Sequence, residues 1–246
     1  MATTPAIPVA DTPGPLPVPP LQSGDRLTVE EFERRYSAMP SLKKAELIEG
    51  IVYVPSPVSE DHASPHFDFI GWLAMYRFAT PGIIGGDNGS LRLDIGSMPQ
   101  PDAYLRIDER HGGQARLGPD RYVIGAPELI AEVAVTSANY DLREKLNAYR
   151  RNEVREYVVW RVWDRAIDWF VLRQGQYEPL LLGEDGICRS EFLPGLWLDP
   201  AALLRGDFPA VARAAQQGIA SPEHAAFVQK LQLTAAQSIS SAPSQI

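Results

Sequence analysis

One short stretch, residues 127–135 (PELIAEVAV), constrains the fold of this chain more than any other. Every residue from Leu129 to Val135 is apolar except Glu132. A short run rich in Val and Ile predicts a buried strand. A carboxylate inside such a strand costs several kcal/mol unless another group pairs with it. We therefore expect a partner for Glu132 in the folded protein.

The segment after this strand offers such a partner. Residues 141–152 (DLREKLNAYRRN) predict a helix in which Leu142, Leu146 and Tyr149 form one apolar stripe. At 100° per residue, Lys145 lies within about 60° of the centre of that stripe. It is the only lysine between residues 45 and 229. On the inward face of a helix packed against the strand, its ammonium could approach Glu132.

The other patterns predict an α/β fold with a mixed sheet and helices on its faces. Thr28 and Glu31 form a capping box that starts a helix, and a second helix runs from residues 59–64 to about residue 78. Strands are expected at residues 47–54, 90–95, 100–107, 127–135, 155–162, 166–172 and 177–182. The last three are close enough for hairpins, with one helical crossover between residues 135 and 157.

The two ends of the chain differ from its middle. Seven of the 22 prolines fall in the first twenty residues, so residues 1–24 are predicted to be a disordered, partly polyproline II tail. That tail could instead be a ligand for a proline-binding groove. One domain is expected over residues 25–206. Residues 207–246, rich in Ala, Gln and Ser, are expected to be a partly helical tail, with a helix at 221–231.

Charge and composition narrow the class of protein. The 246 residues carry a net charge of −8, which argues against a strongly basic surface for DNA or membranes but leaves room for a local basic cleft. The single cysteine, Cys188, can form no internal disulfide and fits a reducing cytoplasm. The first residues have no basic segment typical of a signal peptide, and no apolar run approaches the length of a membrane span.

Three polar residues suggest a catalytic site. Asp102 follows Pro101 at the start of one predicted strand, Glu132 lies in the next long strand, and Lys145 lies on the following helix. Two carboxylates on neighbouring strands are hard oxygen ligands suited to Mg²⁺ or Mn²⁺. Such a metal polarises a phosphodiester and activates water, and a nearby cation stabilises the developing negative charge.

Plainer interpretations stay open. Asp102 could be a loop residue beside two prolines, and Glu132 with Lys145 could be a buried structural ion pair. His62 and His66, four residues apart, resemble a zinc pair, but no glutamate stands between them in an H-E-x-x-H pattern and no third ligand is evident. We expect them to cap and line a helix, although His62 could reach the site from the helix start.

A family resemblance rests on several motifs in a fixed order. They are LTVEEFERR, ELIEG at 46–50, PSPVSEDH at 55–62, PD at 101–102, GAPELIAEV at 125–133, DLREKLNAY at 141–149 and LPGLWLDPAAL at 193–203. Over residues 26–206 the chain resembles the Uma family of restriction endonucleases, within the PD-(D/E)XK nuclease superfamily. The resemblance implies a restriction-endonuclease-like core of four mixed strands, with Asp102 and Glu132 as metal carboxylates. It also suggests Glu60, at the start of a helix, as a third acid.

The sequence departs from that pattern in places. The superfamily lysine lies two residues after the acid, where this chain has Ala134. Lys145 looks like its substitute, reaching in from the helix. The loop after the acid is VTSANYD rather than a Ser-Pro-Ser type, and Glu153 takes the place of a glycine after the helix.

The function expected from this resemblance is a cytoplasmic, Mg²⁺- or Mn²⁺-dependent endonuclease that hydrolyses phosphodiester bonds. Its expected partner is nucleic acid, DNA above all, with no membrane and with a homodimer as the assembly to consider. The main alternative is a nuclease fold that has lost catalysis and serves as a binding or assembly module, which the acidic charge favours. A small-molecule hydrolase built on the same acids is a third hypothesis.

Overall fold

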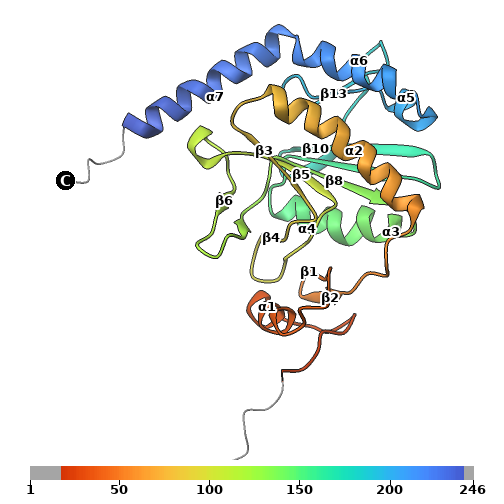
Figure 1. Ribbon diagram of the computed structural model, residues 1–246, viewed down its shortest axis with the longest axis vertical. Helices are drawn as coiled ribbons and strands as arrows, with labels where there is room; N and C mark the ends of the chain where they lie inside the picture. The colour runs from red at the N-terminus through yellow and green to blue at the C-terminus, as the bar shows by residue number, and fades with distance from the viewer. Residues whose placement is uncertain (1–17, 241–246) are drawn as a thin grey trace, which may run out of the picture.

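A mixed sheet of six strands forms the centre of the computed structural model, which describes residues 18–240 (Figure 1). Its strands, in spatial order, are β11 (Gln176–Pro179), β10 (Ala166–Arg173), β9 (Glu156–Arg161), β8 (Leu129–Ala134), β5 (Ala103–Ile107) and β3 (Ile83–Asp87). Within this sheet, only β8 and β9 pair in parallel, and the helical segment between them forms the expected crossover. The predicted mixed sheet flanked by helices is confirmed.

Helices cover both faces of this sheet (Figure 1). The helices of the described chain are α1 (Val29–Ser37), which lies in a separate N-terminal layer, α2 (Glu60–Ala79), α3 (Ala138–Tyr140), α4 (Leu146–Arg151), α5 (Pro200–Arg205), α6 (Phe208–Ile219) and α7 (Pro222–Ser240). Side chains alternate along β8: Leu129, Ala131 and Val133 pack in the core under α2, whereas Ile130 and Ala134 pack in the core under α4. By this two-residue period Glu132 faces α4. The strand therefore directs its one carboxylate toward the crossover helix.

The N-terminal part packs as a small layer at one end of the sheet. Thr28 caps α1, since its hydroxyl accepts a hydrogen bond from the Glu31 N–H. The strand expected at residues 47–54 is instead a hairpin of β1 (Glu46–Ile48) and β2 (Ile51–Tyr53). The hairpin turns at Glu49 and Gly50, whose φ angles are 51° and 79°, and such left-handed pairs make tight hairpin turns.

The structure differs in part from the prediction of two loose tails. Residues 1–17 lie outside the described residues, but Leu21 is buried against Phe32 and Leu47, so packing begins before residue 24. At the other end, α6 contributes Val211 and Ala215 to the core under α2. The Ala-rich sequence of α6 predicted a tail, because small side chains give only a weak apolar pattern. In the structure, these small side chains let α6 pack closely against α2. Residues 241–246 lie outside the described residues.

Shorter elements complete the described part of the chain. Three strands form a small sheet in the order β4 (Leu91–Arg92), β7 (Val123–Ile124) and β6 (Arg116–Leu117), and β12 (Cys188–Arg189) pairs with β13 (Trp197–Leu198). A 3₁₀ turn spans Glu109–His111 and a π-helical turn spans Asp141–Lys145. Within residues 18–240, no helix is both long and apolar enough to cross a membrane.

Candidate active site

The register of β5 against β8 places Asp102 beside Glu132. Regular pairing between these strands runs from Leu105↔Leu129 to Ala103↔Ala131. Beyond it, the Asp102 N–H donates to Glu132 Oε2 over 3.3 Å, and the Val133 N–H donates to Asp102 Oδ2 over 2.9 Å. The Asp102 side chain thus takes a hydrogen bond from the strand backbone where the strand pairing stops. Asp102 is not a free loop residue beside two prolines, because its carboxylate is part of the sheet's hydrogen bonding.

An ammonium and an imidazole contact the buried Asp102 carboxylate. Lys44 Nζ lies 3.0 Å from Oδ1, and His62 Nε2 lies 3.0 Å from Oδ2. Burial alone would raise the pKa of Asp102, but the hydrogen bond to His62 and the charge of Lys44 outweigh burial and hold that pKa well below its usual range. Asp102 is therefore ionised at neutral pH.

Glu132 meets the lysine that the helical stripe predicted. Lys145 Nζ lies 2.8 Å from Glu132 Oε1, and the Tyr149 hydroxyl donates to the same oxygen over 2.9 Å. Burial raises the pKa of Glu132, and the ammonium of Lys145 offsets that effect only in part because Asp102 adds a second negative charge nearby. A proton is accordingly held more tightly on Glu132 than on an ordinary glutamate.

Lys145 lies inside a shell of carboxylates. Besides Glu132, its Nζ approaches Glu46 on β1 at 3.1 Å and Asp141 at 3.7 Å. The ring of Tyr140 lies 5.3 Å from the ammonium. The π-helical turn ends at Lys145, and single π turns are frequent at functional sites because they shift side chains around the helix. Burial would lower the pKa of Lys145, but the three carboxylates raise it well above its usual value.

The first turns of α2 reach the other side of Asp102. His66 Nε2 lies 2.8 Å from the Asp102 backbone oxygen and 3.2 Å from Asp87 Oδ1. The two histidines therefore turn toward Asp102 and its neighbours, rather than acting alone as a zinc pair. The side chains of His62 and Lys44 keep 20% and 23% of their surface exposed, whereas Lys145 keeps 4%. The site opens to solvent on the side of His62 and Lys44.

The donor set agrees with a divalent metal ion at Asp102 and Glu132. In the described part of the chain, no three or more His, Cys, Asp and Glu side chains form a group that could hold a metal alone. Mg²⁺ needs no such group, because it is commonly held by one or two carboxylates and keeps several waters. Four carboxylates, from Glu46, Asp102, Glu132 and Asp141, are buried here, and two ammonium groups contact them, that of the buried Lys145 and that of the partly exposed Lys44. If all ionise, the acids exceed the ammonium groups by the charge of one divalent cation.

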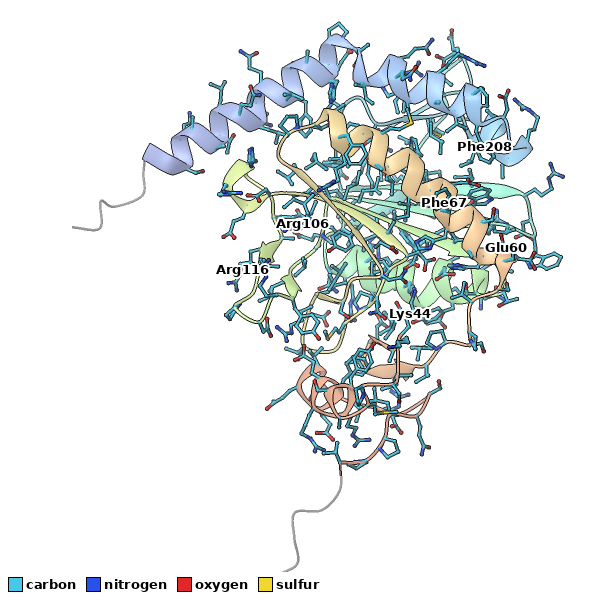
Figure 2. The ribbon with its side chains drawn as sticks, viewed as in Figure 1. Lys44, Glu60, Phe67, Arg106, Arg116 and Phe208 are labelled. Atoms are coloured by element: carbon cyan, nitrogen blue, oxygen red, sulfur yellow. The ribbon has the colours of Figure 1, made fainter. Side chains whose placement is uncertain are left out.

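Of the four residues proposed from the sequence, the structure brings three together. Glu60 is exposed at the first residue of α2 and makes none of the hydrogen bonds or ion pairs that join the other three. Figure 2 shows it at the outer end of that helix, away from Lys44. Its side chain lies two residues before His62, on a different side of the helix start.

Sequence reasoning missed three charged groups of this site, those of Glu46, Asp141 and Lys44. Glu46 carried a usable signal, since it stands beside Leu47 and Ile48 in an apolar run, as Glu132 does in its own strand. Lys44 carried none, because it follows Lys43, an exposed lysine of the same type. Only the approach of the segment before β1 to β5 distinguishes the two.

Comparisons with known proteins add a family. The family model "Uma2: Putative restriction endonuclease" matches residues 29–201. One solved structure that matches is described as "a putative nuclease belonging to DUF820 from Anabaena variabilis ATCC 29413". The two chains are 10% identical, the match covers 60% of this chain and 82% of that one, and the TM-score is 0.48. No curated protein is significantly similar to the chain.

Proposed function

The chain belongs to the Uma2 family, whose model is described as "Putative restriction endonuclease", and from this premise we propose that it is a metal-dependent endonuclease that hydrolyses phosphodiester bonds in DNA. The observation that carries the proposal is the convergence of Asp102 and Glu132 from adjacent strands, both buried, with Lys145 2.8 Å from the glutamate. The family membership agrees with the resemblance of the motifs over residues 26–206.

Asp102 and Glu132 are the proposed ligands of Mg²⁺ or Mn²⁺. When bound, the cation would supply charge for the phosphate and acidify water. The chain's own groups prepare that place: the Val133 N–H orients the Asp102 carboxylate, while Lys145 and Tyr149 orient that of Glu132. Fixed orientation lets these groups act on the transition state without reorganising during the reaction.

The reaction is an ordinary hydrolysis. The oxygen of a water molecule forms a new bond to phosphorus, and the bond between phosphorus and the leaving sugar oxygen breaks. One proton of that water ends on the leaving oxygen, and the other remains on the new phosphate monoester until it ionises. Negative charge grows on the phosphate during attack, so a site that offers cations favours the transition state.

DNA is the proposed substrate because the family's description names restriction endonucleases. The chain's net charge of −8 opposes broad electrostatic binding of a polyanion. Local basic groups must therefore attract the phosphate, and the open side of the site carries the ammonium of Lys44 beside the imidazole rings of His62 and His66.

Cleavage of supercoiled plasmid tests the proposal. We expect nicking or linearisation with Mg²⁺ or Mn²⁺ and none with EDTA, because the two carboxylates alone repel the phosphate. Agarose electrophoresis of the products is the measurement. If no plasmid, linear duplex or single strand is cut under any of these metal conditions, the protein is better described as a nuclease fold that binds or assembles without catalysis.

A further inference from the structure

We infer that Lys44 is the ammonium that contacts the substrate phosphate, whereas Lys145 holds Glu132 in place and does not touch the substrate. This inference rests on the proposed nuclease function and names the residue that would bind the phosphodiester. Two lysines lie at the site from different parts of the fold, and their surroundings separate their roles.

Lys145 has no N–H group free to bind a phosphate. An ammonium has three N–H groups, and Lys145 Nζ already faces the carboxylates of Glu132, Glu46 and Asp141 at 2.8, 3.1 and 3.7 Å. Its side chain is 4% exposed, and the Tyr140 ring lies on it. A phosphate could reach it only by displacing buried acids.

Lys44 has the opposite surroundings. Its Nζ contacts Asp102 Oδ1 at 3.0 Å and Asn88 Oδ1 at 3.2 Å, and no other group in the described part of the chain accepts a hydrogen bond from it. Asn88 is itself exposed, in the turn after β3. One N–H of Lys44 is thus available on the side where the site opens to solvent.

The position of Lys44 also fits the charge that a substrate brings. The Lys44 ammonium donates a hydrogen bond to Asp102, one of the proposed metal ligands. A phosphate held near Asp102 would therefore lie within reach of this ammonium. A phosphodiester approaching Asp102 meets a buried negative charge, and Lys44 supplies the ammonium that lies 3.0 Å from this carboxylate on the exposed side. Figure 2 shows Lys44 between the N-terminal hairpin and the sheet.

Two assays on the full chain separate the lysines. The first is plasmid cleavage with Mn²⁺, and the second is fluorescence anisotropy with a short labelled DNA duplex, with Ca²⁺ to occupy the carboxylates. Lys44→Met should lower the cleavage rate by about 10²-fold, the usual loss for one charge-stabilising donor. It should also lessen the slope of log Kd against log salt by about 1, the signature of one lost phosphate contact.

Three companion variants sharpen the result. Lys43→Met is the matched control, because it removes an exposed neighbouring lysine with no ion pair among the described residues, and it should leave both assays unchanged. Lys44→Arg keeps the charge and should retain most of the binding. Lys44→Gln keeps a donor for Asp102 without the charge and should behave like Lys44→Met, which covers the case in which methionine disturbs folding.

Each outcome decides a different statement. If the wild type binds and cleaves while Lys44→Met matches it in both assays, the inference is overturned and the nuclease proposal stands. If the wild type binds without cleaving and Lys44→Met loses one salt-dependent contact, Lys44 is the phosphate contact and the catalytic proposal fails. A wild type that neither binds nor cleaves overturns both, and an equal loss in Lys43→Met also overturns the role of Lys44.

Discussion

Replacing Asp102 by Asn should lower metal-dependent DNA cleavage by about 10²-fold or more, which corresponds to roughly 3 kcal/mol of lost transition-state stabilisation. The substitution keeps the shape of the side chain and a hydrogen-bond acceptor for the Val133 N–H. It removes the negative charge that a divalent cation needs. Glu132→Gln should produce a loss of the same order, because Glu132 is the second proposed ligand.

A matched control separates this effect from damage to the fold. Asp61 is an exposed carboxylate on α2, one residue before His62, with no hydrogen bond or ion pair among the described residues. Asp61→Asn should cleave like the wild type. Rates of plasmid cleavage and melting curves of all variants provide the comparison. Full activity in folded Asp102→Asn or Glu132→Gln would show that catalysis does not depend on this pair.

Replacing Lys145 by Met should destabilise the metal-free protein by about 3–5 kcal/mol, the usual cost of breaking a buried ion pair from one side. Methionine keeps the length of the side chain but leaves three buried carboxylates without their ammonium. Since domains are stable by only about 5–15 kcal/mol, the melting temperature should fall strongly. Thermal and urea unfolding of the variant, with EDTA present, measure the change.

The double variant Lys145→Met with Glu132→Gln shows whether this lysine serves one acid or several. Glu46 and Asp141 also contact Lys145, so neutralising Glu132 should restore only part of the lost stability. Complete recovery of stability in the double variant would show that Lys145 and Glu132 form an isolated structural ion pair. A Lys145→Met protein as stable as the wild type would contradict the contacts themselves. The Mn²⁺ affinity of Lys145→Met, measured below its melting temperature, should also weaken, because Lys145 orients the Glu132 carboxylate. A purely structural role of Lys145 would leave that affinity unchanged.

The central strand and its carboxylate could be predicted because two independent periods agree there. The two-residue period of β8 directs Glu132 toward the following helix, and the apolar stripe of that helix directs Lys145 toward β8. The predicted contact is present, although the helix contains a π turn at Asp141–Lys145 that no sequence pattern indicated. The burial of a charged residue in each element was the informative signal.

Other parts of the fold depend on backbone conformations and packing that a sequence pattern does not display. The hairpin at Glu49 needs a left-handed glutamate, and Glu153, with φ of 61°, adopts a left-handed conformation where the resemblance expects glycine. Edge strand β3 contains Gly85 and Gly86, which lack strand propensity, yet Gly86 is required because a Cβ there would lie 2.1 Å from the Tyr104 ring. Lys44 joins the site only through long-range contact with Asp102.

Binding of Mn²⁺ tests the central claim most directly, because the competing description of a nuclease fold without catalysis does not require it. Calorimetric titration of the metal-free protein should show one Mn²⁺ bound per chain, together with a rise in melting temperature that grows with metal concentration. The same titration of Asp102→Asn should show neither. An absence of binding to the wild type, or an equal rise in melting temperature for the wild type and Asp102→Asn, would contradict a metal site at Asp102 and Glu132.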